Sequence, residues 1–185
     1  SHILVSHTHR DHSPLSRRLQ ASTGAVILAE GPHRASRPLH EGEVNPFAES
    51  SDSGFTPDRR LADGERIEGD GFTLSAIHTP GHTANHLAFA LAETNALFPG
   101  DHVMGWATSV VSPPDGDMGD YMASLEKLLL RDDRIYYPGH GEAIERPQRL
   151  VRGLLGHRKQ REGQILRLLR AGTVDIPAMV EKMYV

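Results

Sequence analysis

The stretch HTHRDH, residues 7–12, constrains this chain more than any other part of its sequence. It places three histidines and one aspartate, all able to bind a metal ion, directly after the short apolar run ILVS. Such a run favours a buried strand, so we expect the motif in the loop at the end of that strand. His7 and His9 are two residues apart, which on extended backbone directs both imidazoles to one face, where they can share a cation.

Three later turns carry further metal-capable side chains. His82 lies in TPGHT, Asp101 in FPGDH and His140 in YPGHG, each beside a glycine that lets the backbone bend sharply near an ion. The chain has no cysteine, so any metal is held by nitrogen and oxygen, which suits zinc or a similar ion better than calcium or magnesium. Together with HTHRDH, the three later turns supply five imidazoles and two carboxylates, which is more than one tetrahedral ion can use. Two ions that share Asp101 would use them all and leave room for a bridging hydroxide.

Short strands dominate the first 145 residues. Apolar and β-branched runs predict the strands, and the turn GDG predicts a hairpin within an antiparallel set. The segments 31–58 and 103–118 are expected to be loops, because the first shows no regular hydrophobic periodicity and the second contains an irregular stretch. We expect these loops to determine the substrate specificity. The predicted strands are 3–6, 25–29, 60–67, 72–79, 86–91, 95–98 and 134–137.

Helices are predicted on either side of these strands. One begins near Ser13 and Pro14 and stops at Gly24, and another covers 120–130, where apolar residues recur at helical spacing. A long, basic, interrupted helix is expected over 147–170, in which two glycines either weaken the helix or allow close packing. A last helix is expected over 176–184.

HTHRDH, then GHT, GD and GH in that order, resemble the metallo-β-lactamase superfamily, whose hallmark is H-x-H-x-D-H followed by His, Asp and His. The resemblance covers most of residues 1–145 and implies a four-layer αββα sandwich of the α/β class that lacks its opening strands. It also implies two metal ions and their ligands. The first ion would take His7, His9 and His82, the second Asp11, His12 and His140, and Asp101 would bridge them.

Within that superfamily the sequence is similar to one branch in particular. True β-lactamases of the best-known zinc class have a cysteine at the position of Asp11, so penicillin hydrolysis is not expected. The Asp-His pair resembles glyoxalase II and RNA-processing nucleases. TPGHTANHLAFAL and the basic HRKQREGQIL resemble metallohydrolases with a C-terminal winged-helix-like unit, among them an endoribonuclease that acts on single-stranded RNA. The resemblance divides the chain into a catalytic domain, 1–145, and a basic helix with a truncated winged unit, 146–185.

The net charge of −4 is unevenly distributed. Residues 1–145 carry 11 Lys and Arg against 21 Asp and Glu, whereas residues 146–185 carry 9 against 3. A basic tail either follows a phosphate backbone or is an ordinary solvated helix face, and aromatic residues that would stack on bases are missing from it. The candidate nucleic-acid contacts are Arg149, Arg152, Arg158, Lys159 and Arg161.

The favoured hypothesis is a hydrolase with two zinc ions, or with iron or manganese, that cleaves an ester-type bond with the bridging hydroxide. Asp11 is expected to accept the proton and pass it to the leaving group. The substrate is either the phosphodiester of single-stranded RNA or a small thioester, as in glyoxalase II. A rival hypothesis is a nucleic-acid-binding module whose metals only hold the fold. Structural zinc sites are closed by four ligands, however, and this ligand set leaves open positions.

Two further histidines lie close in sequence to candidate ligands. We expect His86 and His102 to orient a ligand by a hydrogen bond rather than to bind a metal. No apolar run approaches the roughly 20 residues that a membrane-spanning helix needs. We therefore expect a soluble, cytoplasmic protein.

Overall fold

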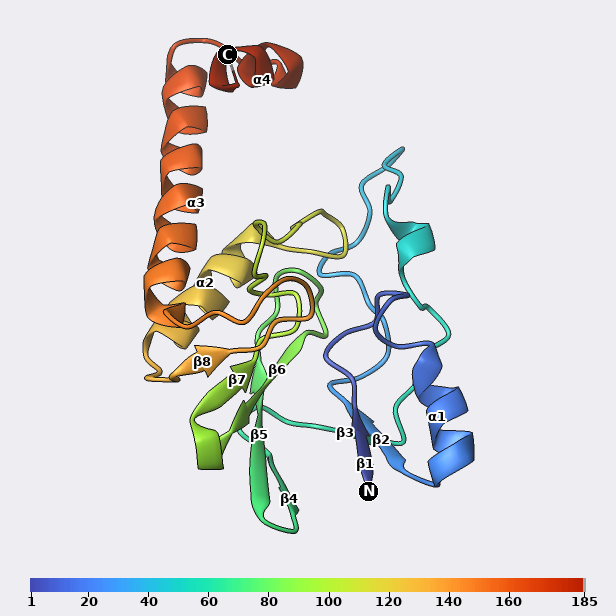
Figure 1. Ribbon diagram of the computed structural model, residues 1–185. Helices are drawn as coiled ribbons and strands as arrows, with labels where there is room; N and C mark the ends of the chain where they lie inside the picture. Colours follow the sequence, from blue (N-terminus) through green and yellow to red (C-terminus); the bar gives the residue numbers. More distant parts are fainter. Residues whose placement is uncertain (185) are drawn as a thin grey trace.

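Two β-sheets lie face to face between helices in the computed structural model, which describes residues 1–184 (Figure 1). In chain order the elements are β1 His2–Leu4, α1 Leu15–Thr23, β2 Val26–Ala29, η1 Ala48–Ser50, β3 Arg59–Arg60, β4 Arg66–Gly69, β5 Phe72–His78, β6 Leu87–Leu91, η2 Ala92–Thr94, β7 Ala96–Phe98, α2 Met118–Leu129, β8 Ile135–Tyr136, α3 Pro147–Arg170 and α4 Ile176–Met183. Helices α2 and α3 cover one sheet and α1 lies outside the other (Figure 1). The expected αββα sandwich is confirmed.

The smaller sheet has the order β1-β2-β3 and is parallel throughout. Parallel neighbours need a crossover connection, which α1 supplies between β1 and β2. Helix α1 ends where Gly24 takes the left-handed conformation, φ 67°, that glycine adopts without a steric penalty.

The larger sheet has the order β4-β5-β6-β7-β8. Its first four strands are antiparallel, as expected, and β4 and β5 form the predicted hairpin. The expectation of antiparallel strands is wrong for β8, which pairs with β7 in parallel. The reason is that α2 intervenes between these strands and carries the chain back to the opposite end of the sheet.

Three apolar clusters separate the four layers. Leu28 and Leu87 belong to the cluster between the sheets, whereas Ile27 lies on the α1 side of the smaller sheet and Ala88 on the helical side of the larger one. Successive side chains of a strand point to opposite faces, so β2 and β6 each feed two clusters. This explains why LAFAL in β6 is apolar at every position.

Helix α3 is continuous over 24 residues, so the expected interruption is wrong. A Cβ added at Gly153 or Gly156 would meet no atom within 4 Å, so neither glycine provides close packing. The buried side chains of α3 all lie in its first half, in the core shared with α2. The second half leaves the body, and α4 lies across its end (Figure 1).

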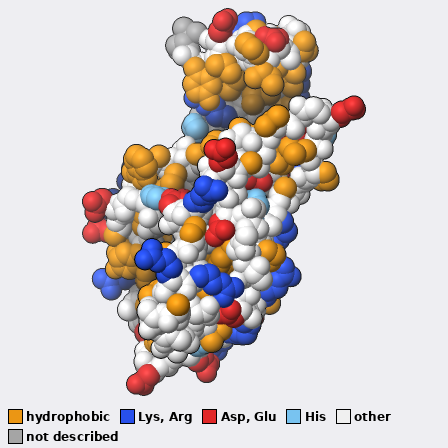
Figure 2. Space-filling model, turned by 90° about the vertical axis from the view of Figure 1, so that its right-hand side faces the viewer, with side chains coloured by type: hydrophobic (Ala, Val, Ile, Leu, Met, Phe, Trp, Pro, Cys, Tyr) orange, Lys and Arg blue, Asp and Glu red, His pale blue; other side chains and the backbone are white. Residues whose placement is uncertain are grey.

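Apolar side chains are exposed on this protruding arm, which we define as residues 161–184. Figure 2 shows them as an orange area at the top of the molecule. The most exposed are Val174, Ile176 and Tyr184. The division of the chain at residue 145 and the winged-helix-like unit stay predictions, and Val185 lies outside the described residues. No helix among residues 1–184 combines the length and the hydrophobicity needed to cross a membrane.

Helix α2 offers a test of the core between helices and sheet. Leu128 is fully buried, whereas Leu130, two residues later, is 89% exposed. Leu128→Ala should lower the free energy of unfolding by about 2–5 kcal/mol, because it removes buried methyl groups and leaves a cavity. Leu130→Ala should change it by less than about 0.5 kcal/mol. Urea denaturation of both variants measures the difference, and equal losses would contradict the packing.

Candidate metal centre

Strand direction brings the candidate ligands to one edge of the sandwich. Strands β5 and β7 are both antiparallel to β6, and β8 is parallel to β7, so β5, β7 and β8 all end at the same edge. The turns after these three strands carry His82, Asp101 and His140. The loop after β1, in the other sheet, carries HTHRDH. The backbone N–H of Leu87 donates to the carbonyl of Ser6 at 2.7 Å and joins the two sheets beside the site.

Three imidazoles form the first ligand group. His7 Nε2 and His82 Nε2 each lie 3.0 Å from His9 Nδ1. Nitrogens at the corners of a tetrahedron around zinc, at 2.0–2.1 Å from it, lie about 3.4 Å apart. Two of the three nitrogen pairs therefore have nearly the separation that one such ion requires, and all three donors lie within 4.8 Å of one another.

The second group consists of Asp11, His12 and His140. The Nε2 atoms of His140 and His12 lie 3.1 Å and 3.6 Å from Asp11 Oδ2. Asp101 stands between the groups. Its Oδ1 is 3.3 Å from His12 Nε2, and its Oδ2 is 3.4 Å from His140 Nε2 and 3.9 Å from His82 Nε2. The structure thus brings together all seven residues that the sequence predicted.

The hydrogen bonds of these residues fit a bound cation. His82 Nδ1 donates to the carbonyl of Val110 at 2.6 Å, which leaves the lone pair of Nε2 free. His12 Nε2 and Asp101 Oδ1 are buried and lie 3.3 Å apart, but neither atom makes a hydrogen bond of good geometry with any described residue. Buried polar atoms are rarely left without a partner, and a metal ion would supply one.

Burial sets the protonation of the first group. It lowers the pKa of His9 to about 4, and neighbouring His82 adds to the effect. Burial also lowers the pKa of His7 and His82, in His7 well below the usual value. All three are therefore neutral near pH 7, the form that binds metals. Burial opposes ionisation of Asp101, but His12, His82 and His140 together hold its pKa below the usual value.

Of the two histidines expected to orient a ligand, His86 makes such a contact. Its Nε2 accepts a 3.2 Å hydrogen bond from the backbone N–H of Asp101, and its Nδ1 lies 2.8 Å from the hydroxyl of Thr79. His102 makes no such contact among the described residues. Its ring is fully buried against Tyr121, with centroids 4.7 Å apart, and neither nitrogen has a partner among the described residues.

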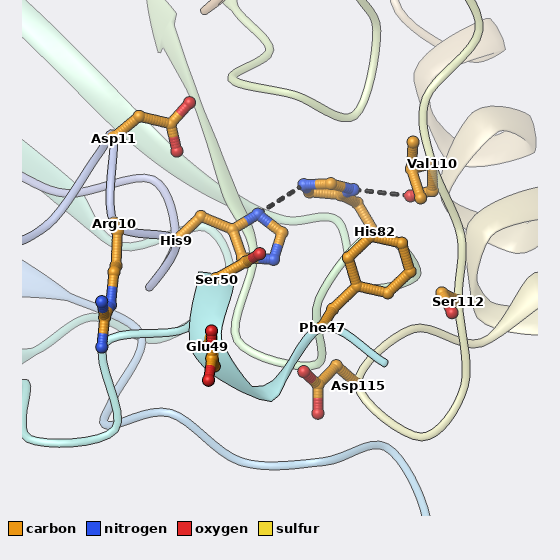
Figure 3. Close-up of a pocket in the computed structure, with 10 residues that line it drawn as sticks. All are labelled: His9, Arg10, Asp11, Phe47, Glu49, Ser50, His82, Val110, Ser112 and Asp115. Atoms are coloured by element: carbon orange, nitrogen blue, oxygen red, sulfur yellow. Dashed lines mark hydrogen bonds between the residues drawn. The ribbon is translucent and has the colours of Figure 1, made fainter. Parts of the chain in front are cut away.

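A pocket of about 510 Å³ opens over the first ligand group (Figure 3). His9, His82 and Asp11 line it, together with side chains from the two loops that the sequence predicted to choose the substrate. Asp11 has 59% of its side chain exposed. The loop residues are Phe47, Glu49, Ser50, Val110, Ser112 and Asp115.

Asp115 joins those two loops, and no sequence pattern indicated it. Both oxygens of its carboxylate accept a hydrogen bond from Asn45 Nδ2 at 3.0 Å, and Oδ2 accepts another from Ser51 Oγ at 3.3 Å. His33 Nε2 lies 3.6 Å from the same carboxylate, and its Nδ1 is 3.0 Å from the hydroxyl of Thr8. The segment 31–58 is therefore attached both to the second loop and to HTHRDH.

The basic residues predicted to contact nucleic acid do not form one free face. Arg158 donates to the carbonyl of Ser109 at 2.7 Å, and Lys159 pairs with Glu126 at 2.9 Å. Arg161 lies over the ring of Tyr184, at 4.4 Å from its centroid. Arg149 and Arg152 are exposed.

Gly139 offers a steric test of the centre. A Cβ at this position would lie 2.4 Å from Asp101 Oδ1 and 3.0 Å from His12 Cε1. Gly139→Ala must displace one of them, so we expect Co²⁺ affinity to fall by at least about tenfold, as for disturbed ligand supports. The matched control is Gly153→Ala, whose methyl group meets no atom within 4 Å. Calorimetric titration of both variants checks this, and wild-type affinity in Gly139→Ala would contradict the arrangement.

The pKa of His9 predicts how the metal-free protein responds to acid. This imidazole titrates at about 4 when folded, against 6.5 for the ordinary value. Between these values the unfolded chain binds more protons, so the free energy of unfolding falls as pH decreases from 6.5 toward 4. Urea denaturation of metal-free protein over this range measures the slope, and His9→Gln should reduce it. A stability independent of pH would contradict the burial of this cluster.

Curated proteins from fungi are similar to this chain. The lactamase-like protein adaB of Aspergillus niger is 31% identical over 203 residues, which span 100% of this chain and 55% of that protein. The atrochrysone carboxyl ACP thioesterase AgnL7 of Paecilomyces divaricatus is 33% identical over 169 residues, which span 90% of this chain and 46% of that protein. The chain thus spans about half the length of these relatives.

Fold and sequence point to one family. The crystal structure of a metallo-beta-lactamase family protein from Thermus thermophilus superposes with a TM-score of 0.71 at 26% identity and covers 91% of this chain and 64% of that chain. The family model described as the metallo-beta-lactamase superfamily matches residues 1–140. The match contains HTHRDH and the three later turns in the order that the sequence resemblance requires. This chain therefore belongs to the metallo-beta-lactamase superfamily.

Proposed function

We propose that this chain is the catalytic part of a metal-dependent thioester hydrolase. The observation that carries the proposal is the pair of ligand groups joined by Asp101 at the side of an open pocket. A relative 33% identical to the chain is named as a thioesterase, which favours a thioester over other ester-type bonds. The ligands proposed for two ions, with zinc the first choice and iron or manganese the alternatives, are His7, His9, Asp11, His12, His82, Asp101 and His140.

Two divalent cations at these ligands would supply Lewis acidity toward the thioester carbonyl and lower the pKa of water. The protein residue proposed to move a proton is Asp11. Its carboxylate is largely exposed to the pocket, only 3.1 Å from His140 Nε2, and can accept a proton from the attacking water. The same proton then passes to the departing sulfur. A thiolate needs little help, because thiols have a pKa of about 8.5.

The pocket fits an acyl group that carries apolar surface. Phe47 and Val110 line it from opposite loops, and both expose apolar atoms. Asp115 holds these loops together, which keeps the two side chains at a fixed separation across the pocket. We propose that Phe47 and Val110 contact the acyl part of the substrate, while the thiol part extends toward solvent.

Single-stranded RNA is a less well supported substrate for the same candidate site. Arg158 and Arg161 are engaged by the protein itself, and neither of the curated relatives described above is named for RNA. A metal-stabilised binding module is disfavoured because structural sites are closed by protein ligands. Here Asp11 and His140 have 59% and 39% of their side chains exposed.

The absence of cysteine makes the test simple, because a thiol-reactive dye can report released thiol without background from the protein. Zinc-loaded protein is offered thioesters of N-acetylcysteamine with aliphatic and aromatic acyl groups. We expect metal-dependent thiol release that chelation abolishes. Asp11→Asn should lower kcat by at least about 100-fold through loss of the proton acceptor. Asp70→Asn, in the exposed hairpin turn, is the matched control and should leave turnover unchanged.

An end-labelled single-stranded RNA serves as the second substrate. RNA cleavage without thioester turnover would replace the proposed substrate class. Full metal content without turnover of either substrate would support a structural role of the metals instead. Undiminished kcat in Asp11→Asn, with metal bound, would remove the proposed role of that carboxylate.

A further inference from the structure

One short segment contacts two candidate ligands at once. The carbonyl of Val110 accepts the 2.6 Å hydrogen bond from His82 Nδ1. The neighbouring hydroxyl of Ser109 lies 2.6 Å from the carbonyl of Asp101 and 2.9 Å from that of His102. The position of this segment therefore fixes a side chain of the first group and the backbone of the residue that lies between the groups.

The segment 109–110 lies in an irregular loop, so no strand or helix holds it. It is held instead by Arg158, which reaches in from α3. The Nη2 atom of Arg158 donates to the carbonyl of Ser109 at 2.7 Å, and the guanidinium lies 5.5 Å from the ring centroid of Tyr121. Ser109 is buried, with 2% of its surface exposed, and Arg158 is partly buried, so the acceptor end of this charged hydrogen bond is shielded from water.

Burial separates Arg158 from its basic neighbours. Its Nε atom is buried, whereas Lys159 and its partner Glu126 have more than half of each side chain exposed. Exposed ion pairs contribute little, but a charged donor aimed at a buried carbonyl is costly to lose. The positive charge of Arg158, which the sequence left open between a nucleic-acid contact and a solvated helix face, is thus used inside the protein.

The geometry points to Arg158 as a positioning residue of the metal centre. It holds Ser109 and Val110 in place, Val110 fixes the ring nitrogen of His82, and Ser109 fixes the carbonyl of Asp101. Hydrogen bonds that orient ligands in this way commonly change metal affinity by about 10–100-fold. Helix α3, outside the segments that carry the ligands, is by this inference part of the site. The inference rests on the proposed metal centre and is independent of the substrate.

The experiment measures Co²⁺ binding to the whole chain by calorimetry and by the visible spectrum of the bound ion. Arg158→Met keeps the apolar stem and removes the donors, and we expect the affinity to fall at least about tenfold with a changed spectrum. Arg158→Lys retains one charged donor and should recover part of the affinity. Lys159→Met is the matched control from the same helix, and its affinity and spectrum should equal those of the wild type.

The metal-free stability of each variant is measured alongside. If Arg158→Met is less stable but still binds Co²⁺ with wild-type affinity and spectrum, the inference is overturned, because the role of Arg158 would then be packing alone. Wild-type protein that binds no Co²⁺ would instead remove the metal centre itself, so the two failures are distinguishable.

A second variant tests the inference even if Arg158→Met misfolds. Ser109→Ala removes the hydroxyl contact to Asp101 and keeps the carbonyl that Arg158 contacts. We expect it to weaken Co²⁺ binding, and expect the double variant to lose less than the product of the two single losses, since both act through one segment. Unchanged Co²⁺ binding in Ser109→Ala, or independent effects in the double variant, would contradict the link between Arg158 and Asp101.

Discussion

The candidate metal centre depends on how firmly the two sheets are held face to face. One sheet contributes HTHRDH and the other contributes the three turns, so each ligand group takes donors from both sheets and its geometry depends on how the sheets are placed. A slip of one residue moves a strand by about 3.3 Å, whereas metal–ligand bonds tolerate about 0.2 Å. The buried cluster that contains Leu28, Leu87 and Phe89, together with the hydrogen bond from Leu87 to Ser6, prevents such a slip. The apolar core is in this sense a condition for the chemistry.

Electrostatics explains why this edge suits a cation. Burial favours neutral imidazoles at His7, His9 and His82, whose lone pairs converge with no positive charge of their own. The pKa of Asp101 stays low, so a carboxylate faces the same space. Asp11 and His140, with 59% and 39% of their side chains exposed, are the candidate ligands that solvent reaches most. An ion at this edge would meet the lone pairs of buried imidazoles and the shielded charge of Asp101.

The sequence predicted best what depends on local chemistry. HTHRDH and the glycine-flanked turns indicated which side chains the fold brings together, because each of them stands at the end of an apolar strand. The sequence did not predict contacts between segments that are far apart in the chain. No sequence pattern distinguished Arg158 from its basic neighbours, so it was a candidate for a nucleic-acid contact, and Gly153 and Gly156 were expected to weaken α3 or to allow close packing. Asp115 carried no signal, because its partners are 70 and 64 residues away in sequence and only the folded loops bring them together.

The wide spacing of the ligands has a thermodynamic consequence. His9 and His82 are 73 residues apart, and Asp11 and His140 are 129 apart, so each ion would close a long loop of the chain. A cross-link over about 100 residues removes roughly 4–5 kcal/mol of conformational entropy from the unfolded state in the loop-closure treatment. This chain has no cysteine and therefore forms no disulfide bond. The ions would fill that role, and the supply of metal would then set how long each molecule survives against proteolysis as well as how fast it turns over.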